Sequence, residues 1–464
     1  PRRQGVPRIG QPMFHWNGRL LSRFHDKEKK AEIFRGRIDD FRLINAAVTP
    51  TVPATLAAPE PGIDAYFRWM LDNIDEIEKN IPEIADTAEA AAEKYATGDW
   101  NIAGGGDYGV LTEACGRAGG IMALKWGYPP RYLKVGPENK CVMLFALRED
   151  HYEEYLKNTK KHLAGEHAFL VVMGPSDLVK RAEEDGMPMD ASFVVPTAKN
   201  DGLFRGEDDK WLVPTTPTAS MAALWAWTSE FVAACTRHGK MPVMHQSYAV
   251  PGAKERAEKL KDQKFYPKKA TPVPEGKLAR QFLRKLRADV REFYQNEKDK
   301  LARAVNMAWD ARQNGNELYA FVHGHSIVMQ QVNYPHSPGH LTQINKNWFE
   351  QKDKITLQPG DFVFCLGYDH RFNGGRYGKW DEEAREAGAT LVWCLADYKE
   401  EEIAPIKQAG ELFINQHWDY GDAVVEVPGF PLRICPTSGH IAQGILRMFS
   451  AGLLAREKEE QTEN

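Results

Sequence analysis

The sequence has few cysteines, no long apolar run and almost no net charge. Its six cysteines are widely spaced and form no C-x-x-C pair, which favours buried, reduced thiols over a disulfide framework. No stretch of about 18 apolar residues occurs, so we expect no membrane span. With 60 basic and 64 acidic residues, the chain has no general electrostatic reason to bind nucleic acid or an anionic membrane. No apolar segment of signal-peptide type opens the sequence, and a cytoplasmic location is expected.

The length and composition indicate a folded protein of several parts. At 464 residues the chain exceeds one ordinary domain, and 42% hydrophobic residues are enough to build cores. A Pro/Ala-rich stretch, TVPATLAAPEPG, ends an N-terminal region of mixed composition, after which apolar residues recur at helical spacing. We therefore expect an arm and linker (1–62), a first α/β domain (63–240), a connecting segment (241–281) and a second α/β domain (282–464).

Short apolar runs alternate with helical patterns in the first half. CVMLFAL (141–147), AFLVVM (168–173) and ASFVVP (191–196) have the length of strands, and segments of helical pattern separate them. Strands with few polar interruptions, alternating with helices, predict a parallel sheet covered on both faces. Upstream, a strand-like WNIA followed by glycines at 104–106 predicts a glycine-rich loop that leads into a helix.

The same order of segments returns in the second half. DFVFCL (361–366) follows CVMLFAL at an offset of about 220 residues, TLVWCL (390–395) corresponds to AFLVVM, and ELFIN (411–415) corresponds to ASFVV. A Pro-Thr pair precedes the closing helix of each half. Repetition at a nearly constant offset indicates a tandem duplication, although any two parallel α/β units align loosely.

In the second half, Gly360-Asp361 stands before one predicted strand and Ala387-Gly388-Ala389 before the next. With this pattern the repeated unit resembles the SIS (sugar isomerase) family of phosphosugar-binding α/β domains. The loop at 323–326 keeps a glycine and the serine of the family's G-x-G-x-S motif, whereas the loop at 103–107 keeps only the glycine. The resemblance covers roughly residues 65–235 and 283–460. It implies two doubly wound, flavodoxin-like, three-layer α/β units in tandem, a sugar or sugar-phosphate ligand, and a homodimer or higher homo-oligomer.

Candidate binding residues lie in the loops that follow the predicted strands, because ligands of open parallel sheets bind beyond the carboxyl ends of the strands. Glycine-rich turns, hydroxyls, imidazoles and a guanidinium in these loops suit an anion or a sugar. The Ser/Thr-rich phosphate loop of the SIS family is missing at 146–150 and 367–375, so a phosphorylated and an unphosphorylated ligand both stay open. The predicted substrate-binding residues are Gly105, Gly106, Asp107, Gly324, His325, Ser326, Asp369, His370, Arg371, Asn373, Thr437, Ser438 and His440.

Histidines concentrate in the second half. Seven of the 14 lie between residues 323 and 440, and four of these fall in HGHSIVMQQVNYPHSPGH, with spacings found in zinc sites. Pro335 and Pro338 interrupt the helix that would align His336 with His340, and no cysteine accompanies them. We therefore predict neither a metal nor a cofactor. At least one of these histidines is expected to bind a sugar or transfer a proton, while a structural role stays open for each.

Catalytic candidates come mainly from the resemblance. Aldose–ketose isomerisation needs a base that moves a proton between adjacent carbons and a group that opens the sugar ring. In double-SIS isomerases a glutamate and a histidine after the first closing helix serve these roles, which the resemblance places at Glu230 and His245. A solvated charge on a helix surface is the alternative for Glu230. His417 ends a predicted strand beside the aromatic Trp418 and is the third candidate.

Three functional hypotheses are consistent with this sequence. The leading one is a tandem-SIS enzyme that isomerises a sugar or sugar phosphate through an enediol. The second is a non-catalytic sugar-phosphate sensor, because tandem SIS units also serve as regulators. The third is a metal-assisted hydrolase or lyase built around the histidines between residues 323 and 340.

Overall fold

The structure, a computed structural model, describes residues 62–127, 131, 133–206, 209–323, 332, 334–344, 355–367, 380–396 and 400–463, together with three short strands near the N-terminus. Contacts within the chain define two units, Pro1–Pro59 and Glu60–Asn464. In the first unit, β1 (Met13–His15), β2 (Arg19–Arg23) and β3 (Ile33–Gly36) pair in an antiparallel sheet in that order. The predicted N-terminal arm therefore contains a small sheet of its own.

The first half of the large unit is built on a five-stranded parallel sheet. Its strands are β4 (Trp100–Gly106), β5 (Leu124–Trp126), β6 (Lys140–Ala146), β7 (Ala168–Gly174) and β8 (Ala191–Val194), in the order β5-β4-β6-β7-β8. The helices are α1 (Ile63–Lys79), α2 (Ile81–Thr97), α3 (Tyr108–Ala114), α4 (Tyr152–His162), α5 (Ser176–Glu184) and α6 (Thr216–Arg237). A short hairpin of β9 (Phe204–Arg205) and β10 (Trp211–Leu212) precedes α6.

The second half repeats this strand order. Its sheet consists of β11 (Leu318–His323), β12 (Thr342–Gln343), β13 (Phe362–Gly367), β14 (Thr390–Leu395) and β15 (Leu412–Asn415), in the order β12-β11-β13-β14-β15. The helices around it are α7 (Ala253–Leu260), α8 (Lys277–Gln313), α11 (Trp380–Glu386), α12 (Glu400–Gln408) and α13 (Ser438–Glu463), and a hairpin of β16 (Ala423–Glu426) and β17 (Arg433–Pro436) precedes α13. Two doubly wound parallel sheets confirm the predicted fold class.

Alternate residues of the central strands face different cores, as the period of a strand requires. In β6, Val142 and Leu144 pack in the inner core with α1, α2 and α6, whereas Met143 and Phe145 pack against α4 and α5. β13 shows the same alternation, with α11 and α12 on its outer face. Each sheet is thus the middle of three layers.

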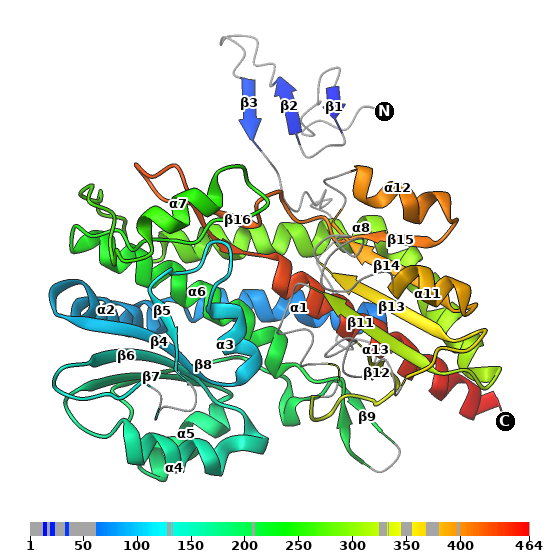
Figure 1. Ribbon diagram of the computed structural model, residues 1–464, viewed down its shortest axis with the longest axis horizontal. Coiled ribbons are helices and arrows are strands. Elements are labelled where there is room, and N and C mark those ends of the chain that lie inside the picture. Colours follow the sequence, from blue (N-terminus) through cyan, green and yellow to red (C-terminus); the bar gives the residue numbers. More distant parts are fainter. Residues whose placement is uncertain are drawn as a thin grey trace, which may run out of the picture. The chain divides into compact units, whose positions relative to one another are not determined.

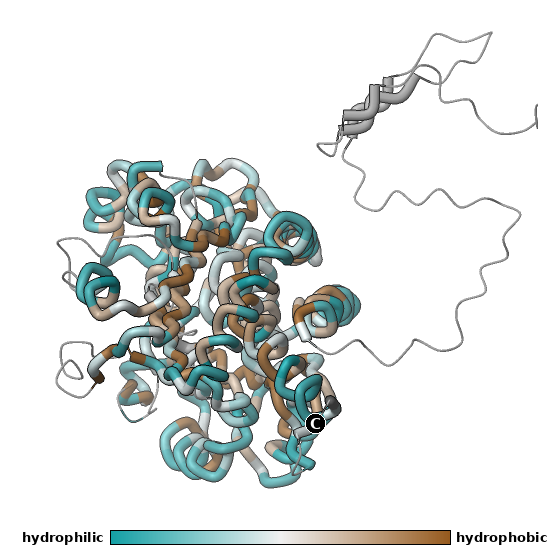
Figure 2. The backbone as a smooth tube through the Cα atoms, turned by 90° about the vertical axis from the view of Figure 1, so that its right-hand side faces the viewer, coloured by the Kyte–Doolittle hydropathy of each residue, from teal (hydrophilic) through white to brown (hydrophobic). Residues whose placement is uncertain are grey.

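The two halves share one inner core. Long helices α1, α6, α8 and α13 lie between the two sheets (Figure 1), and their apolar residues form a single cluster with both sheets. Every residue of α6 from Thr216 to Thr236 is buried, which explains why this helix is apolar on all sides. In Figure 2 the hydrophobic segments accordingly gather in the inner elements and the hydrophilic ones on the outer helices.

The glycines at 104–106 belong to β4 instead of the predicted loop. Gly105 pairs with Phe145 and Gly106 with Ala146 in the parallel ladder between β4 and β6. At Gly106 φ is +83°, and an added Cβ would lie 2.0 Å from the backbone oxygen of Ala146. Gly105 would place a Cβ 2.8 Å from the Phe145 ring. These residues are glycine because β4 lies so close to β6, a packing reason that replaces the predicted anion-binding turn.

Candidate functional site

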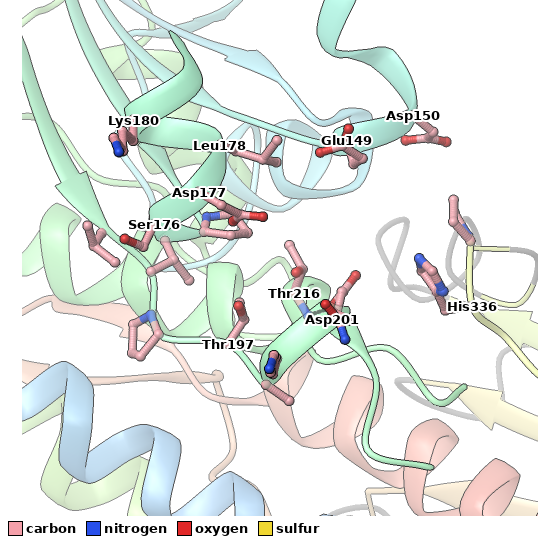
Figure 3. A pocket seen from close by; sticks show the side chains of 18 of the residues that line it. Glu149, Asp150, Ser176, Asp177, Leu178, Lys180, Thr197, Asp201, Thr216 and His336 are labelled. Carbon is pink, nitrogen blue, oxygen red and sulfur yellow. Dashed lines mark hydrogen bonds between the residues drawn. The ribbon is translucent and has the colours of Figure 1, made fainter. Parts of the chain in front are cut away.

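A cavity of about 770 Å³ lies beyond the carboxyl ends of β7 and β8, where an open parallel sheet binds its ligands. Residues of the first half form most of its wall, and Tyr334, Pro335 and His336 of the second half close one side. Figure 3 shows His336 on one side, Ser176 and Lys180 on the opposite side, and Thr216 and Asp201 between them. Glu149 and Asp150, which follow the predicted strand at 141–147, and Thr216, at the start of α6, also line the cavity.

Asp201 fixes the start of α6 at the floor of the cavity. Its Oδ1 accepts hydrogen bonds from the backbone N–H of Thr215 at 2.9 Å and of Thr216 at 2.6 Å, and from the Thr215 hydroxyl at 3.1 Å. Asp201 has φ of +52°, a conformation that Asp and Asn tolerate better than most residues. The carboxylate therefore occupies the helix end that could otherwise receive an anion.

The start of α5 forms the opposite wall, and no side chain among the described residues caps it. Pro175 precedes the helix, its carbonyl accepts a hydrogen bond from Val179 at 2.9 Å, and its ring nitrogen carries no N–H. Ser176 and Asp177 in the first turn are exposed. This wall offers a hydroxyl, a carboxylate and backbone amides to a ligand.

Glu149 and Asp150 are held by arginines outside the cavity wall. Arg181 Nη1 lies 3.1 Å from Glu149 Oε1, and Arg148 donates through Nε and Nη2 to both oxygens of Asp150, at 2.6 and 2.7 Å. The bidentate pair fixes the orientation of Asp150. Both carboxylates can accept hydrogen bonds from the hydroxyls of a ligand.

His336 is the histidine that the structure brings to this cavity. Its Nδ1 lies 2.9 Å from the backbone oxygen of Trp211, and its own carbonyl accepts a hydrogen bond from Val213 at 2.8 Å. Because a carbonyl only accepts, Nδ1 must carry the proton, which leaves Nε2 as the group able to exchange one. The backbone φ of +67° is unusual for a residue with a side chain, and such strain clusters at functional sites.

The predicted catalytic residues have other partners. Glu230 is fully buried in α6, and its two oxygens accept the backbone N–H groups of Gly276 at 2.8 Å and Ala279 at 3.0 Å, so it caps the start of α8. Burial raises the pKa of Glu230, and the two amides oppose this shift. A general base needs a free oxygen at the ligand, and Glu230 is neither free nor at the cavity. The predicted surface alternative is also wrong, because the residue is buried.

The two predicted catalytic histidines do not line the cavity. The backbone of His245 exchanges hydrogen bonds with the loop after α3, donating to Gly120 and accepting from Gly119, and burial lowers its pKa. The His417 Nε2 lies 3.1 Å from Glu297 Oε1 on α8. Burial raises the pKa of Glu297, but hydrogen bonds from His417 and Lys300 outweigh it and hold the pKa below its usual value.

The point where strand order reverses in the first half, between β4 and β6, is filled by the chain. Asp107 caps α3, accepting from the N–H groups of Gly109 at 2.7 Å and Val110 at 3.2 Å. Arg148 Nη1 lies 3.9 Å from the other carboxylate oxygen of Asp107, and its guanidinium carbon lies 4.4 Å from the ring centre of the buried Tyr334. Asp107, which was predicted to bind the ligand, thus caps α3 and lies beside Arg148, whose guanidinium is covered by Tyr334.

The predicted loop at 437–440 is likewise engaged within the protein. The Thr437 hydroxyl donates to Asp289 at 2.8 Å, and the Ser438 hydroxyl donates to Asp422 at 2.7 Å. Asp422 also accepts the backbone N–H of Ser438 at 3.2 Å, which caps α13. His440 is fully buried, and within the part of the chain that the structure describes neither of its ring nitrogens has a hydrogen-bond partner.

Burial lowers the pKa of His440 to about 3, which predicts an acid-sensitive fold. Between the unfolded pKa of about 6.5 and the folded value, only the unfolded chain takes up the proton, so this group reduces stability as the pH falls. The unfolding free energy of His440→Leu minus that of the wild type is expected to be about 2 kcal/mol more positive at pH 5 than at pH 8. Urea unfolding of both proteins at the two pH values measures this difference. An unchanged pH dependence would mean that His440 is protonated or paired in the folded protein.

The remaining predicted binding residues, Gly324, His325, Ser326, Asp369, His370, Arg371 and Asn373, lie outside the described residues. Of the histidines behind the metal hypothesis, His336 pairs with the Trp211 oxygen and His340 Nε2 with Glu457 at 3.1 Å. Within the described ranges no group of three side chains is placed to hold a metal ion. Nor does any helix described there have the length and apolar character needed to cross a membrane.

Comparisons with known proteins give structural likeness only. No family model and no curated protein matches the chain. Similar solved structures include the C-terminal domain of glucosamine-fructose-6-phosphate aminotransferase from Francisella tularensis, at 10% identity over 84% of this chain and 96% of that chain, with a TM-score of 0.41. Tagatose-6-phosphate ketose/aldose isomerase from Escherichia coli is 9% identical over 87% and 93% of the chains, with a TM-score of 0.37. Glucosamine-6-phosphate deaminase from Thermotoga maritima is 11% identical over 85% and 94%, with a TM-score of 0.35.

Proposed function

We propose that the chain binds a sugar or sugar phosphate in the cavity beyond β7 and β8 and interconverts its aldose and ketose forms. The observation that carries this proposal is that His336 lines the same cavity as several acidic and hydroxyl-bearing side chains, at the carboxyl edge of a parallel sheet (Figure 3). Sugar hydroxyls both donate and accept hydrogen bonds, and this wall offers both kinds of partner. The cavity volume of about 770 Å³ is large enough for a ligand of monosaccharide size.

The proposed chemistry is proton transfer through an enediol. One group takes the proton from the carbon beside the carbonyl and returns it to the former carbonyl carbon, while the proton of the neighbouring hydroxyl moves to the carbonyl oxygen. His336 Nε2 supplies the group that acts on carbon, because Nδ1 is fixed on Trp211. The carboxylates of Glu149 and Asp150 accept hydrogen bonds from the hydroxyls of the ligand and so orient its carbon chain. Ser176 at the start of α5 binds the far end of the ligand.

Exchange of solvent deuterium into the ligand tests this activity. Aldoses, ketoses and their 6-phosphates are incubated with the protein in D₂O, and NMR follows the hydrogen on the carbon beside the carbonyl. An enediol enzyme exchanges this hydrogen and forms the isomer of at least one compound. A protein that binds a compound in a calorimeter but exchanges no hydrogen is not an isomerase of it.

A sugar sensor without catalytic activity is the second candidate. The observation that favours it is the fate of the three predicted catalytic residues, since Glu230, His245 and His417 hold protein contacts away from the cavity. Among the described residues that line the cavity, His336 is then the one histidine available for proton transfer. Binding of the same compounds without exchange supports the sensor.

A further inference from the structure

We infer that the cavity takes an uncharged sugar in preference to its phosphate ester. This inference rests on the proposed function and narrows its ligand class. A protein usually holds a phosphate with free backbone amides at a helix start, with hydroxyl clusters or with unpaired guanidinium and ammonium groups. Around this cavity most such groups are already engaged by carboxylates of the chain.

The first argument concerns the helix start at the cavity floor. The N–H group of Thr216 at the start of α6, and that of Thr215 before it, donate to Asp201, the former at 2.6 Å. A phosphate at this place would have to displace a carboxylate that accepts three hydrogen bonds. Two other helices, α3 and α13, are capped in the same way by Asp107 and Asp422. At each of these three helix starts, a carboxylate of the chain thus occupies the place where an anionic ligand could bind.

The second argument concerns the cations. Arg148 forms a bidentate pair with Asp150, lies 3.9 Å from Asp107 and is covered by Tyr334. Arg181 contacts both Glu149 and Glu153. Neither arginine is left to neutralise a phosphate. Among the described residues that line the cavity are four carboxylates, Glu149, Asp150, Asp177 and Asp201, and two ammonium groups, Lys180 and Lys199. Arg148 and Arg181 already neutralise Asp150 and Glu149. Asp201 and Asp177 lie at the starts of α6 and α5, and each repels a dianion bound at its helix start.

The start of α5 is the position where the cavity still offers uncapped amides, and Asp177 lies in that first turn. A carboxylate there is favourable for the helix but lies where a phosphate would bind. A neutral hydroxyl meets no such repulsion and can donate to Asp177 while it accepts from Ser176. The same wall that disfavours a phosphate therefore suits the hydroxyl at the far end of a free sugar.

Matched pairs of ligands test the inference. Isothermal titration compares fructose with fructose 6-phosphate, glucose with glucose 6-phosphate, and inorganic phosphate alone. The free sugar that binds is expected to bind at least about tenfold more tightly than its 6-phosphate, because like charges in a partly enclosed site repel. Asp201→Asn removes one charge and keeps an oxygen that caps α6, since Asn is as good a cap as Asp. In this variant the ratio of the affinity for the free sugar to the affinity for its 6-phosphate is expected to fall about tenfold.

Asp209→Asn is the matched control, because the Asp209 side chain is 82% exposed and lies outside the cavity wall. Its preference should equal that of the wild type. A 6-phosphate that binds more tightly than its free sugar overturns the inference and leaves the proposed function standing. An Asp201→Asn preference identical to the wild type also overturns it. If no sugar or sugar phosphate of the panel binds, the proposed function fails together with the inference.

Discussion

Replacing His336 by asparagine is expected to slow the exchange of solvent deuterium into the ligand by at least about 10²-fold, the usual contribution of a general acid–base. Asparagine is chosen because it tolerates the positive φ of +67° and can donate its amide to the Trp211 oxygen in place of Nδ1. The loop should therefore keep its conformation while the proton-transferring nitrogen is lost. NMR-detected exchange on the wild type and the variant gives the ratio.

The control for this experiment is His162→Asn at the end of α4, outside the cavity wall. This variant should exchange deuterium at the wild-type rate. Ligand affinity is measured alongside, since a group that acts only in proton transfer changes the rate more than the binding. Equal exchange rates in His336→Asn and the wild type would remove His336 from the mechanism.

Replacing Glu230 by alanine is expected to lower the free energy of unfolding by about 3–4 kcal/mol. The carboxylate is fully buried, and its loss leaves the N–H groups of Gly276 and Ala279 at the start of α8 without their acceptor. Removal of the side chain also leaves a cavity between α6 and α8, two helices of the inner core. Urea unfolding followed by circular dichroism measures the loss.

Glu230→Gln separates this structural role from the predicted catalytic one. Glutamine keeps one acceptor oxygen at nearly the same volume, so it should lose less stability than alanine does. Its folded molecules should exchange deuterium at the wild-type rate, because Glu230 does not line the cavity. A stable Glu230→Gln protein without exchange activity would restore Glu230 as the catalytic base and contradict the structural assignment.

The fold was predictable because its signals are local. The apolar runs at 141–147 and 361–366 have the length and composition of buried strands, and their repetition indicated two similar units before any contact was known. The structure gives both sheets the same strand order. The glycines at 104–106 were misplaced because a glycine run usually marks a turn, whereas here the close approach of Ala146 requires glycine within a strand.

The site was less predictable because it joins segments far apart in the chain. Glu149 follows the predicted strand at 141–147, and Thr216 precedes the Pro-Thr pair before the first closing helix, so the positions of these two residues in the sequence were informative. His336 belongs to the second half but contacts Trp211 of the first. Hydrophobic periodicity along the sequence cannot predict a contact between two such distant segments, and the two prolines around His336 indicated only a loop. Similarly, only the structure shows that Glu230 meets the start of α8 and that Asp107 and Asp422 cap helices.

The most direct measurement of the central claim is a titration of a cavity-blocking variant. Ser176 is exposed at the first position of α5 and lines the cavity, so Ser176→Trp places a large ring at its mouth without disturbing the core. Glu184→Trp adds the same ring at the other end of α5, where the side chain is 65% exposed and outside the wall. Calorimetry with the sugar that the wild type binds should show wild-type affinity for Glu184→Trp and at least about tenfold weaker binding for Ser176→Trp. Equal affinity in all three proteins would contradict the claim that this cavity binds the ligand.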